Sequence, residues 1–395
     1  MNHNSFNGQR LREALQFRGM RMSELANSTD ISKQSLSLYA NGENNPPFEN
    51  VRRISIALGF PFEYFMTQDS CTVSTDNIYF RSQVSAKKLD QNAQRVKLEY
   101  VAKLYDVLLD YVDFPQLNIP DVNFESPENP LDADSDDVIE QIEKIATDAR
   151  LFWGLDMDPI DNMQFFLESN GIIVTGFKDV DRKIDAFSQK LNIQDFGSIY
   201  IIALALGNGK TQSRLLFDMA HELGHILLHR WEDSSENLTK DEFNAMEKQA
   251  NIFASAFLLP SQSFGKDVKP YANNIEFYKS LKNKWGVSMQ AMMYRARQLK
   301  IISLNQFQYM MRRMSANGNR IKEPGDVIGH LNETIFQGAV DILFDEGCIS
   351  KKNLLDSFNR YGIYLSQRDL EDIMGLKEGT LSTDPSYRQL VKTKR

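Results

Sequence analysis

Two histidines and a glutamate stand at a spacing that suits metal-dependent hydrolysis. His221 and His225 are four residues apart in residues 214–229, and Glu222 follows His221 directly. Apolar residues recur in this segment at three- and four-residue steps, which predicts a helix lying on a core. Residues four apart stand one above the other on a helix, so the two imidazoles can bind one zinc ion. Glu222 then faces the same ion, where a carboxylate can take a proton from water.

A second helical segment offers a third metal ligand. Glu247 opens residues 247–260, whose apolar residues form one face and which end at Pro260. Its carboxylate would complete a His/His/Glu set with one coordination position open, as in catalytic zinc sites. Asn251 lies one turn beyond Glu247, and we expect it to hold a ligand in place. The alternative is a helix with two surface histidines, in which Glu247 is a solvated charge.

His229 lies one turn beyond His225 in the same segment. Three roles are open for it, namely a spare metal ligand, a donor to the oxyanion of the reaction, or support of a ligand. Support is the role that we expect, because such residues more often orient a ligand than bind the metal.

These segments resemble the ImmA/IrrE family of metallopeptidases. Residues 217–229 read Phe-Asp-Met-Ala-His-Glu-Leu-Gly-His-Ile-Leu-Leu-His, and Glu-x-x-Ala-Asn-x-Phe-Ala-x-x-Phe-Leu-Leu-Pro follows from Glu247. Residues 185–188 (Asp-Ala-Phe-Ser) and 285–288 (Trp-Gly-Val-Ser) are similar to that family too, as are Ala291, Tyr294 and Arg295. The resemblance covers about residues 137–325 and implies a zincin-like domain with a small β-sheet. Two positions depart from the family pattern, Leu216 and Asp218, and the extra carboxylate of Asp218 either tunes the site or spoils it.

The first part of the chain has the pattern of a DNA-binding domain. Residues 1–68 predict five short helices, and the second and third are joined by a tight turn, as in a helix-turn-helix whose second helix enters a major groove. The motifs resemble those of lambda-repressor-like (XRE) domains, notably Leu25-Ala26, Ile31-Ser32 and Tyr64-Phe65. The alternative is a small helical bundle used for protein contacts. The residues expected to contact double-stranded DNA are Arg21, Ser32, Lys33, Gln34 and Ser37.

Composition limits the other classes of function. The chain has 395 residues, 42% hydrophobic and 25% charged, which is typical of a soluble protein of two or three domains. It contains neither an apolar run long enough for a membrane span nor an apolar signal core, so we expect a cytoplasmic location. Cys71 and Cys348 lie far apart, which indicates neither a disulfide framework nor a thiolate zinc site. The net charge of -8 argues against nucleic-acid binding over the whole surface, although one small domain can still bind DNA.

The predicted fold class is α+β and predominantly helical. After residues 1–68, residues 85–136 are expected to form a connecting long helix (87–112) and an acidic linker, and residues 137–325 the metallopeptidase domain with strands near 171–176, 185–189 and 199–206. The broad apolar stripe of the long helix favours packing in a core, and pairing with its copy in a homodimer stays open. Residues 326–395 read as a helical region without a motif.

Two accounts of function follow from these patterns. In the first, a zinc endopeptidase attached to a DNA-binding domain cleaves a regulatory protein, and the family resemblance implies a repressor as substrate in a stress or prophage response. In the second, a regulator or antitoxin uses the peptidase fold to sense a ligand or partner and never cuts. Glu222 favours the first account, because a protein without catalysis has no chemical need for a base beside the metal.

Overall fold

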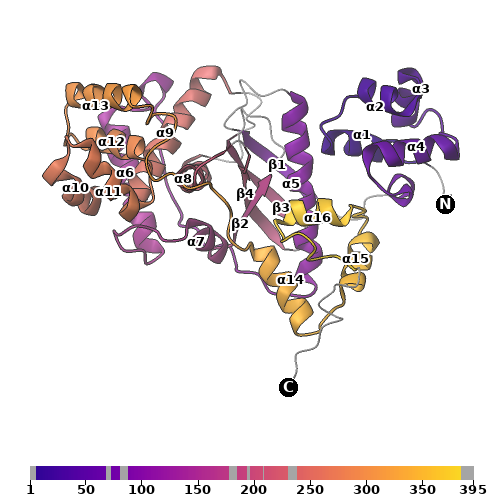
Figure 1. Ribbon diagram of the computed structural model, residues 1–395. Coiled ribbons are helices and arrows are strands. Elements are labelled where there is room, and N and C mark those ends of the chain that lie inside the picture. Colours follow the sequence, from indigo (N-terminus) through magenta and orange to yellow (C-terminus); the bar gives the residue numbers. More distant parts are fainter. Residues whose placement is uncertain are drawn as a thin grey trace.

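The computed structural model describes residues 6–67, 73–80, 88–177, 185–193, 196–207, 209–229 and 238–383. Cys71 lies outside these residues, and Cys348 is exposed. A small sheet stands near the middle of the molecule, with the N-terminal helices at one end and the helices of residues 261–316 at the other (Figure 1). None of the helices in the described ranges is long and apolar enough to cross a membrane. The predominantly helical α+β class predicted from the sequence is confirmed.

Four helices and a 3-10 turn form the N-terminal bundle. They are α1 (Gly8–Phe17), α2 (Met22–Thr29), α3 (Lys33–Ala40), α4 (Phe48–Leu58) and the 3-10 helix η1 (Phe62–Met66), which stands where a fifth helix was predicted. The side chain of Ser32 accepts a hydrogen bond from the backbone N–H of Ser35 and so caps α3. Asp30, at the turn between α2 and α3, adopts the left-handed conformation with φ of 56°, which a short polar side chain tolerates.

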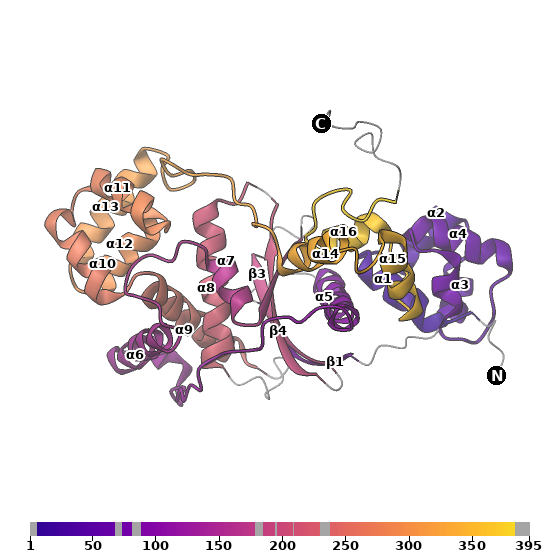
Figure 2. The same cartoon turned by 90° about the horizontal axis from the view of Figure 1, so that it is seen from below.

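The sheet has the strand order β1-β3-β4-β2. Its strands are β1 (Val73–Phe80), β2 (Ile172–Phe177), β3 (Ala186–Ile193) and β4 (Gly197–Ala205). Strands β2 and β4 are parallel, whereas β3 runs antiparallel to β4 and β1 runs antiparallel to β3. Helix α8 (Gln212–Leu228) covers one face of the sheet and α5 (Lys88–Leu109) the other, as Figure 2 shows. The sequence predicted three of these strands and missed β1.

The long helix α5 connects the N-terminal bundle to the sheet. Its apolar stripe is buried, as the breadth of that stripe predicted, and one core unites the bundle, α5 and one face of the sheet. The hydroxyl of Tyr100 on α5 donates to that of Tyr64 on η1 over 3.3 Å. Buried Arg10 on α1 donates to the backbone carbonyl of Gly362 over 3.0 Å. The bundle is therefore packed against the rest of the chain.

The last helices pack on the same side as α5. They are α14 (Ile335–Asp345), α15 (Lys351–Arg360) and α16 (Gln367–Met374). Both guanidinium NH2 groups of Arg18, at the end of α1, pair with the carboxylate of Asp369 on α16, over 2.6 and 2.7 Å. Residues 335–381 thus complete the core that the N-terminal bundle and α5 share.

A second core lies on the opposite face of the sheet. Its helices besides α8 are α6 (Asp136–Phe152), α7 (Met163–Ser169), α9 (Lys240–Leu258), α10 (Ser261–Val268), α11 (Ile275–Trp285), α12 (Met289–Gln298) and α13 (Leu304–Ala316). Buried Arg295 fixes α12 in this core, because its guanidinium donates to the carbonyl of Leu259 over 2.8 Å and pairs with Glu143 on α6. Residues 112–127 run between the two cores without regular structure.

Candidate metal centre

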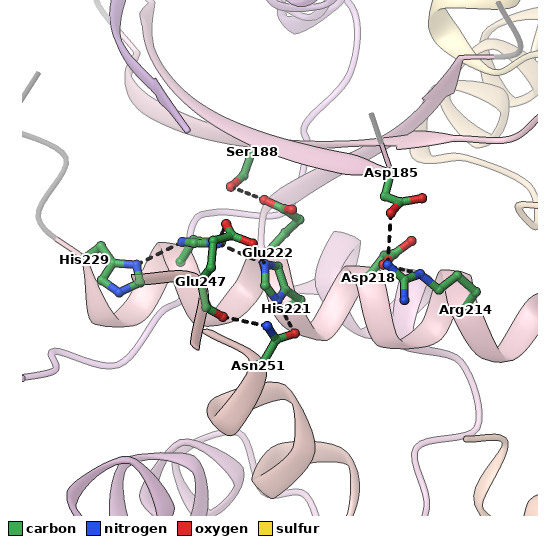
Figure 3. A network of polar contacts seen from close by, with 10 residues as sticks. Asp185, Ser188, Arg214, Asp218, His221, Glu222, His229, Glu247 and Asn251 are labelled. Atoms are coloured by element: carbon green, nitrogen blue, oxygen red, sulfur yellow. Dashed lines mark hydrogen bonds and ion pairs between the residues drawn. The ribbon is translucent and has the colours of Figure 1, made fainter. Parts of the chain in front are cut away.

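Helices α8 and α9 bring three predicted ligands together. His221 and His225 lie one turn apart on α8. Glu247 lies on α9, which packs directly against α8, and its side chain lies beside that of His221 (Figure 3). Gly224 makes this close packing feasible, since a Cβ there would lie 3.1 Å from the ring of Phe253 and 3.2 Å from the carbonyl oxygen of Ala250. A glycine between the two histidines therefore lets α9 approach α8 closely enough to present its carboxylate.

The separations of the donor atoms suit a tetrahedral metal ion. The Nε2 atoms of His221 and His225 are 3.0 Å apart. The Oε1 atom of Glu247 lies 3.2 Å from Nε2 of His225, and its Oε2 atom lies 3.6 Å from Nε2 of His221. Ligand atoms at zinc-ligand distances and tetrahedral angles would be about 3.3 Å apart. Within the described residues, these three form the group that could hold a metal ion.

The outer hydrogen bond of His221 shows which ring nitrogen faces the metal position. Asn251 donates through its amide nitrogen to the backbone carbonyl of Glu247 over 2.7 Å, so its oxygen is left to accept. That oxygen lies 3.1 Å from Nδ1 of His221, which must therefore carry the proton. The Nε2 lone pair of His221 is then directed at the predicted metal position. Asn251 contacts this ring, and its support of a bound ligand stays a prediction.

A buried chain of hydrogen bonds orients His225 in the same way. Gln249 donates to the hydroxyl of Ser126 over 3.3 Å, and its oxygen accepts from Nε2 of His229 over 3.1 Å. Burial, and then the neighbouring His225, lower the pKa of His229 well below its usual value, so this ring is neutral. Its Nδ1 is thus an acceptor for Nδ1–H of His225, 2.9 Å away. Consequently the Nε2 lone pair of His225 also faces the metal position.

With these tautomers, a cation between the two rings would stabilise the site. Two Nε2 lone pairs 3.0 Å apart repel each other unless a positive charge lies between them. Burial by itself raises the pKa of Glu247, but hydrogen bonds from His221 and His225, and then the positive charge of these rings when protonated, outweigh burial and lower the pKa of this carboxyl. A bound metal ion would favour the same carboxylate without any proton on the rings.

Glu222 is buried beside the donor set, below strand β3. The hydroxyl of Ser188 on β3 donates to a carboxylate oxygen of Glu222 over 2.7 Å, and this bond fixes the carboxylate between the strand and α8 (Figure 3). The sequence pattern of residues 185–188 pointed to this stretch but not to the role of Ser188. Gln249 was not predicted at all, because its position on α9 carries no pattern that ties it to His229.

The extra carboxylate of Asp218 is held away from the donor set. It pairs with Lys210 over 2.9 Å and with Arg214 over 3.0 Å. Asp185, at the start of β3, pairs with the same two cations over 3.2 and 3.0 Å. Two acids and two bases thus balance in charge and tie the first turn of α8 to β3, so Asp218 supports the geometry of the site.

Two stretches of the chain match known families. The IrrE N-terminal-like domain matches residues 180–297, and a helix-turn-helix family matches residues 11–65. The chain joins these two domains. All three donors and Glu222 lie in the IrrE-like domain, and the resemblance inferred from the sequence is confirmed for both parts.

Curated proteins and solved structures show less similarity to this chain. No curated protein matches the chain. Among solved structures, a Mycobacterium tuberculosis transcriptional regulator is similar over 40% of this chain and 45% of its own, with 18% identity and a TM-score of 0.27. The similar region thus spans less than half of that regulator.

The residues predicted to contact DNA lie in the helix-turn-helix domain, apart from the metal centre. All of them are exposed, and they lie at the start of α2 and along α3 from its N-cap onward; they are Arg21, Ser32, Lys33, Gln34 and Ser37. Helix α3 lies on the side of the bundle away from α5 (Figure 1). Docking of the bundle therefore leaves this surface open to a partner.

Two further arginines of this domain, on α4, are engaged within the domain. Arg52 and Arg53 on α4 both pair with Glu49, over 3.1 and 3.4 Å. Because this carboxylate neutralises part of their charge, the start of α3 is the better candidate for a DNA-contacting surface.

Proposed function

We propose that this protein is a cytoplasmic, DNA-binding transcriptional regulator whose IrrE-like domain is a zinc-dependent endopeptidase. The helix-turn-helix domain would bind double-stranded DNA, with a homodimer on a two-fold operator. The peptidase would cleave a regulatory protein, a repressor, in a stress or prophage response. The two family matches and the donor set support this assignment.

One observation carries the enzymatic part of the proposal. The site combines three donors with the carboxylate of Glu222, which is held beside them by Ser188 rather than used as a fourth donor. Structural zinc sites are closed by four protein ligands, whereas catalytic sites keep a position open for water or substrate. A donor set of three with an acid beside it fits the catalytic class.

The residues then have distinct roles in peptide hydrolysis. Bound zinc would polarise the scissile carbonyl and make water acidic enough to attack near neutral pH. Glu222 takes the proton from the attacking water and delivers it to the leaving amine. Asn251 and His229 keep the imidazoles of His221 and His225 in the orientation that presents Nε2.

A non-cleaving regulator or antitoxin is the second candidate, and one observation favours it. The helix-turn-helix domain shares a core with α5 and α16, and the Arg18–Asp369 pair joins them. A change in the rest of the chain can therefore reach the DNA-binding domain through packed contacts without any cleavage.

Glu222→Gln separates the two candidates. Glutamine is nearly isosteric but cannot accept the proton, so cleavage should fall by about 10²- to 10⁴-fold. Zinc content and DNA binding should persist, because Glu222 is neither a donor nor part of the DNA-binding domain. New protein N-termini are compared by mass spectrometry in cells that express the wild type or this variant, with exposed Glu140→Gln as the matched control.

The decisive comparison uses the regulatory response itself. Under the endopeptidase proposal, Glu222→Gln abolishes the response together with the new N-termini, whereas Glu140→Gln changes neither. A full response from Glu222→Gln, with no response from His221→Ala, would mean that the metal is structural or sensory.

A further inference from the structure

The outer edge of strand β3 borders the metal centre. One edge of β3 pairs with β4, and Ser188 in the middle of β3 holds Glu222. The opposite edge therefore presents its backbone N–H and C=O groups next to the residue that we assign as the base. An edge of this kind pairs with an extended peptide, because each backbone group needs a hydrogen-bonding partner.

In this chain strand β1 already occupies that edge. Tyr79 pairs with Ser188, Phe80 with Phe187 and Ile78 with Gln189, in antiparallel register. The backbone of β1 thus passes directly opposite the residue that holds Glu222. Strand β1 is the terminal strand of the sheet, so no further strand of the described residues pairs with its outer edge.

We propose that β1 is a built-in occupant of the peptide-binding edge, which a substrate peptide has to displace. This inference rests on the proposed function, because it concerns how the peptidase site is regulated. The substrate would enter as an extended segment that pairs antiparallel with β3, in the place of β1. Strand β1 follows the helix-turn-helix domain directly in sequence, and so the edge is blocked by the segment that leads from that domain to α5.

Intramolecular attachment makes such a strand an effective competitor. Its two ends lead to η1 and α5, which are packed together through Tyr64 and Tyr100. A segment tethered at both ends has an effective concentration of about a millimolar at its own site. An external peptide binds only those molecules in which the edge is open. Its apparent affinity is therefore its intrinsic affinity multiplied by the fraction of such molecules. We expect binding at least about tenfold weaker than to an unblocked edge.

The first test measures peptide binding without catalysis. In the full chain carrying Glu222→Gln, residues 73–80 are replaced by a glycine-serine stretch of equal length. A fluorescent peptide with the sequence of residues 73–80 is then titrated into this protein and into its Glu222→Gln parent, and anisotropy is recorded. The unblocked protein should bind at least about tenfold more tightly than the parent, and a peptide with prolines at alternate positions should bind neither. Equal binding, or no binding by an unblocked protein that still unfolds cooperatively, overturns the proposal.

The second test examines the strand in the intact sheet. Ser74 and Asn192 are paired across β1 and β3, so Ser74→Cys with Asn192→Cys should form a disulfide in a chain whose native cysteines are replaced by serine. Ser74→Cys with Ser198→Cys is the matched control, because Ser198 lies on β4 and not beside β1. If peptide mapping of the folded protein finds no disulfide between positions 74 and 192, the proposal is overturned. This test holds even if the variant with the glycine-serine replacement fails to fold. Neither test needs zinc or turnover. Peptide binding and disulfide formation would therefore still be measurable if the protein had no peptidase activity.

Discussion

Replacement of His229 by alanine tests whether the buried hydrogen-bond chain supports zinc binding. The change removes the acceptor 2.9 Å from Nδ1 of His225 and the donor 3.1 Å from the oxygen of Gln249. A buried polar group left without a partner costs about 1–3 kcal/mol. Loss of such support for a metal ligand weakens metal affinity by about 10- to 100-fold. Expressed as a free energy of binding, this loss lies in the same range as the cost of the unpartnered group.

We therefore expect His229→Ala to bind zinc about 10- to 100-fold more weakly than the wild type, with a stoichiometry still of one. Zinc affinity is measured by competition with a chromophoric chelator at pH 7.5. The control is His330→Ala, which removes an exposed histidine outside the centre. An unchanged dissociation constant would refute the role of the chain, and complete loss of zinc would show that His229 is itself a ligand.

Three further predictions follow from particular contacts. Ser188→Ala should lower the rate of cleavage by about 10- to 100-fold at unchanged zinc content, because Glu222 loses the hydroxyl that holds it; an unchanged rate in a kinetic assay would contradict this. Burial raises the pKa of Glu168 from an ordinary 4.5 to about 7, so the stability it contributes is present below pH 4.5 and lost as the pH rises through 7. Glu168→Gln should remove this loss in the free energy of unfolding, which is about 3 kcal/mol at pH 8. Denaturant unfolding measured over a pH series tests this, and a variant whose stability depends on pH as the wild type does would exclude the role of Glu168. Lys33→Ala should weaken DNA binding and reduce the dependence of log affinity on log salt by about one, whereas Gln34→Ala should leave that slope alone; identical slopes in all three proteins would place the phosphate contact elsewhere.

Local spacing predicted the donor set of the metal centre. Residues four apart on a helix share a face, which brought His221 and His225 together, and the second helix was recognisable by its own apolar period and its proline stop. Glu247 lies where that helix meets α8, and Asn251 follows it by one turn. Short-range geometry was sufficient for these residues because α8 and α9 are regular helices.

Contacts between distant segments were not predictable in the same way. Ser188 and Gln249 act through side chains that meet α8 only after the sheet and α9 have packed, and no period in the sequence encodes that meeting. Strand β1 has apolar residues only at its ends, so it lacks the alternation that marks a half-buried strand. An amphipathic pattern shows that a helix has a partner, but it does not say that α16 packs against α5.

Zinc analysis of the purified full chain tests the central claim most directly. We predict one zinc per chain in the wild type and in Glu222→Gln, and an X-ray absorption spectrum with two imidazole nitrogens and carboxylate oxygen at about 2.0–2.2 Å. His225→Ala should retain no stoichiometric zinc, because a metal held by one imidazole and one carboxylate binds weakly. Stoichiometric zinc in His225→Ala, or sulfur among the ligands of the wild type, would contradict the assignment of the site.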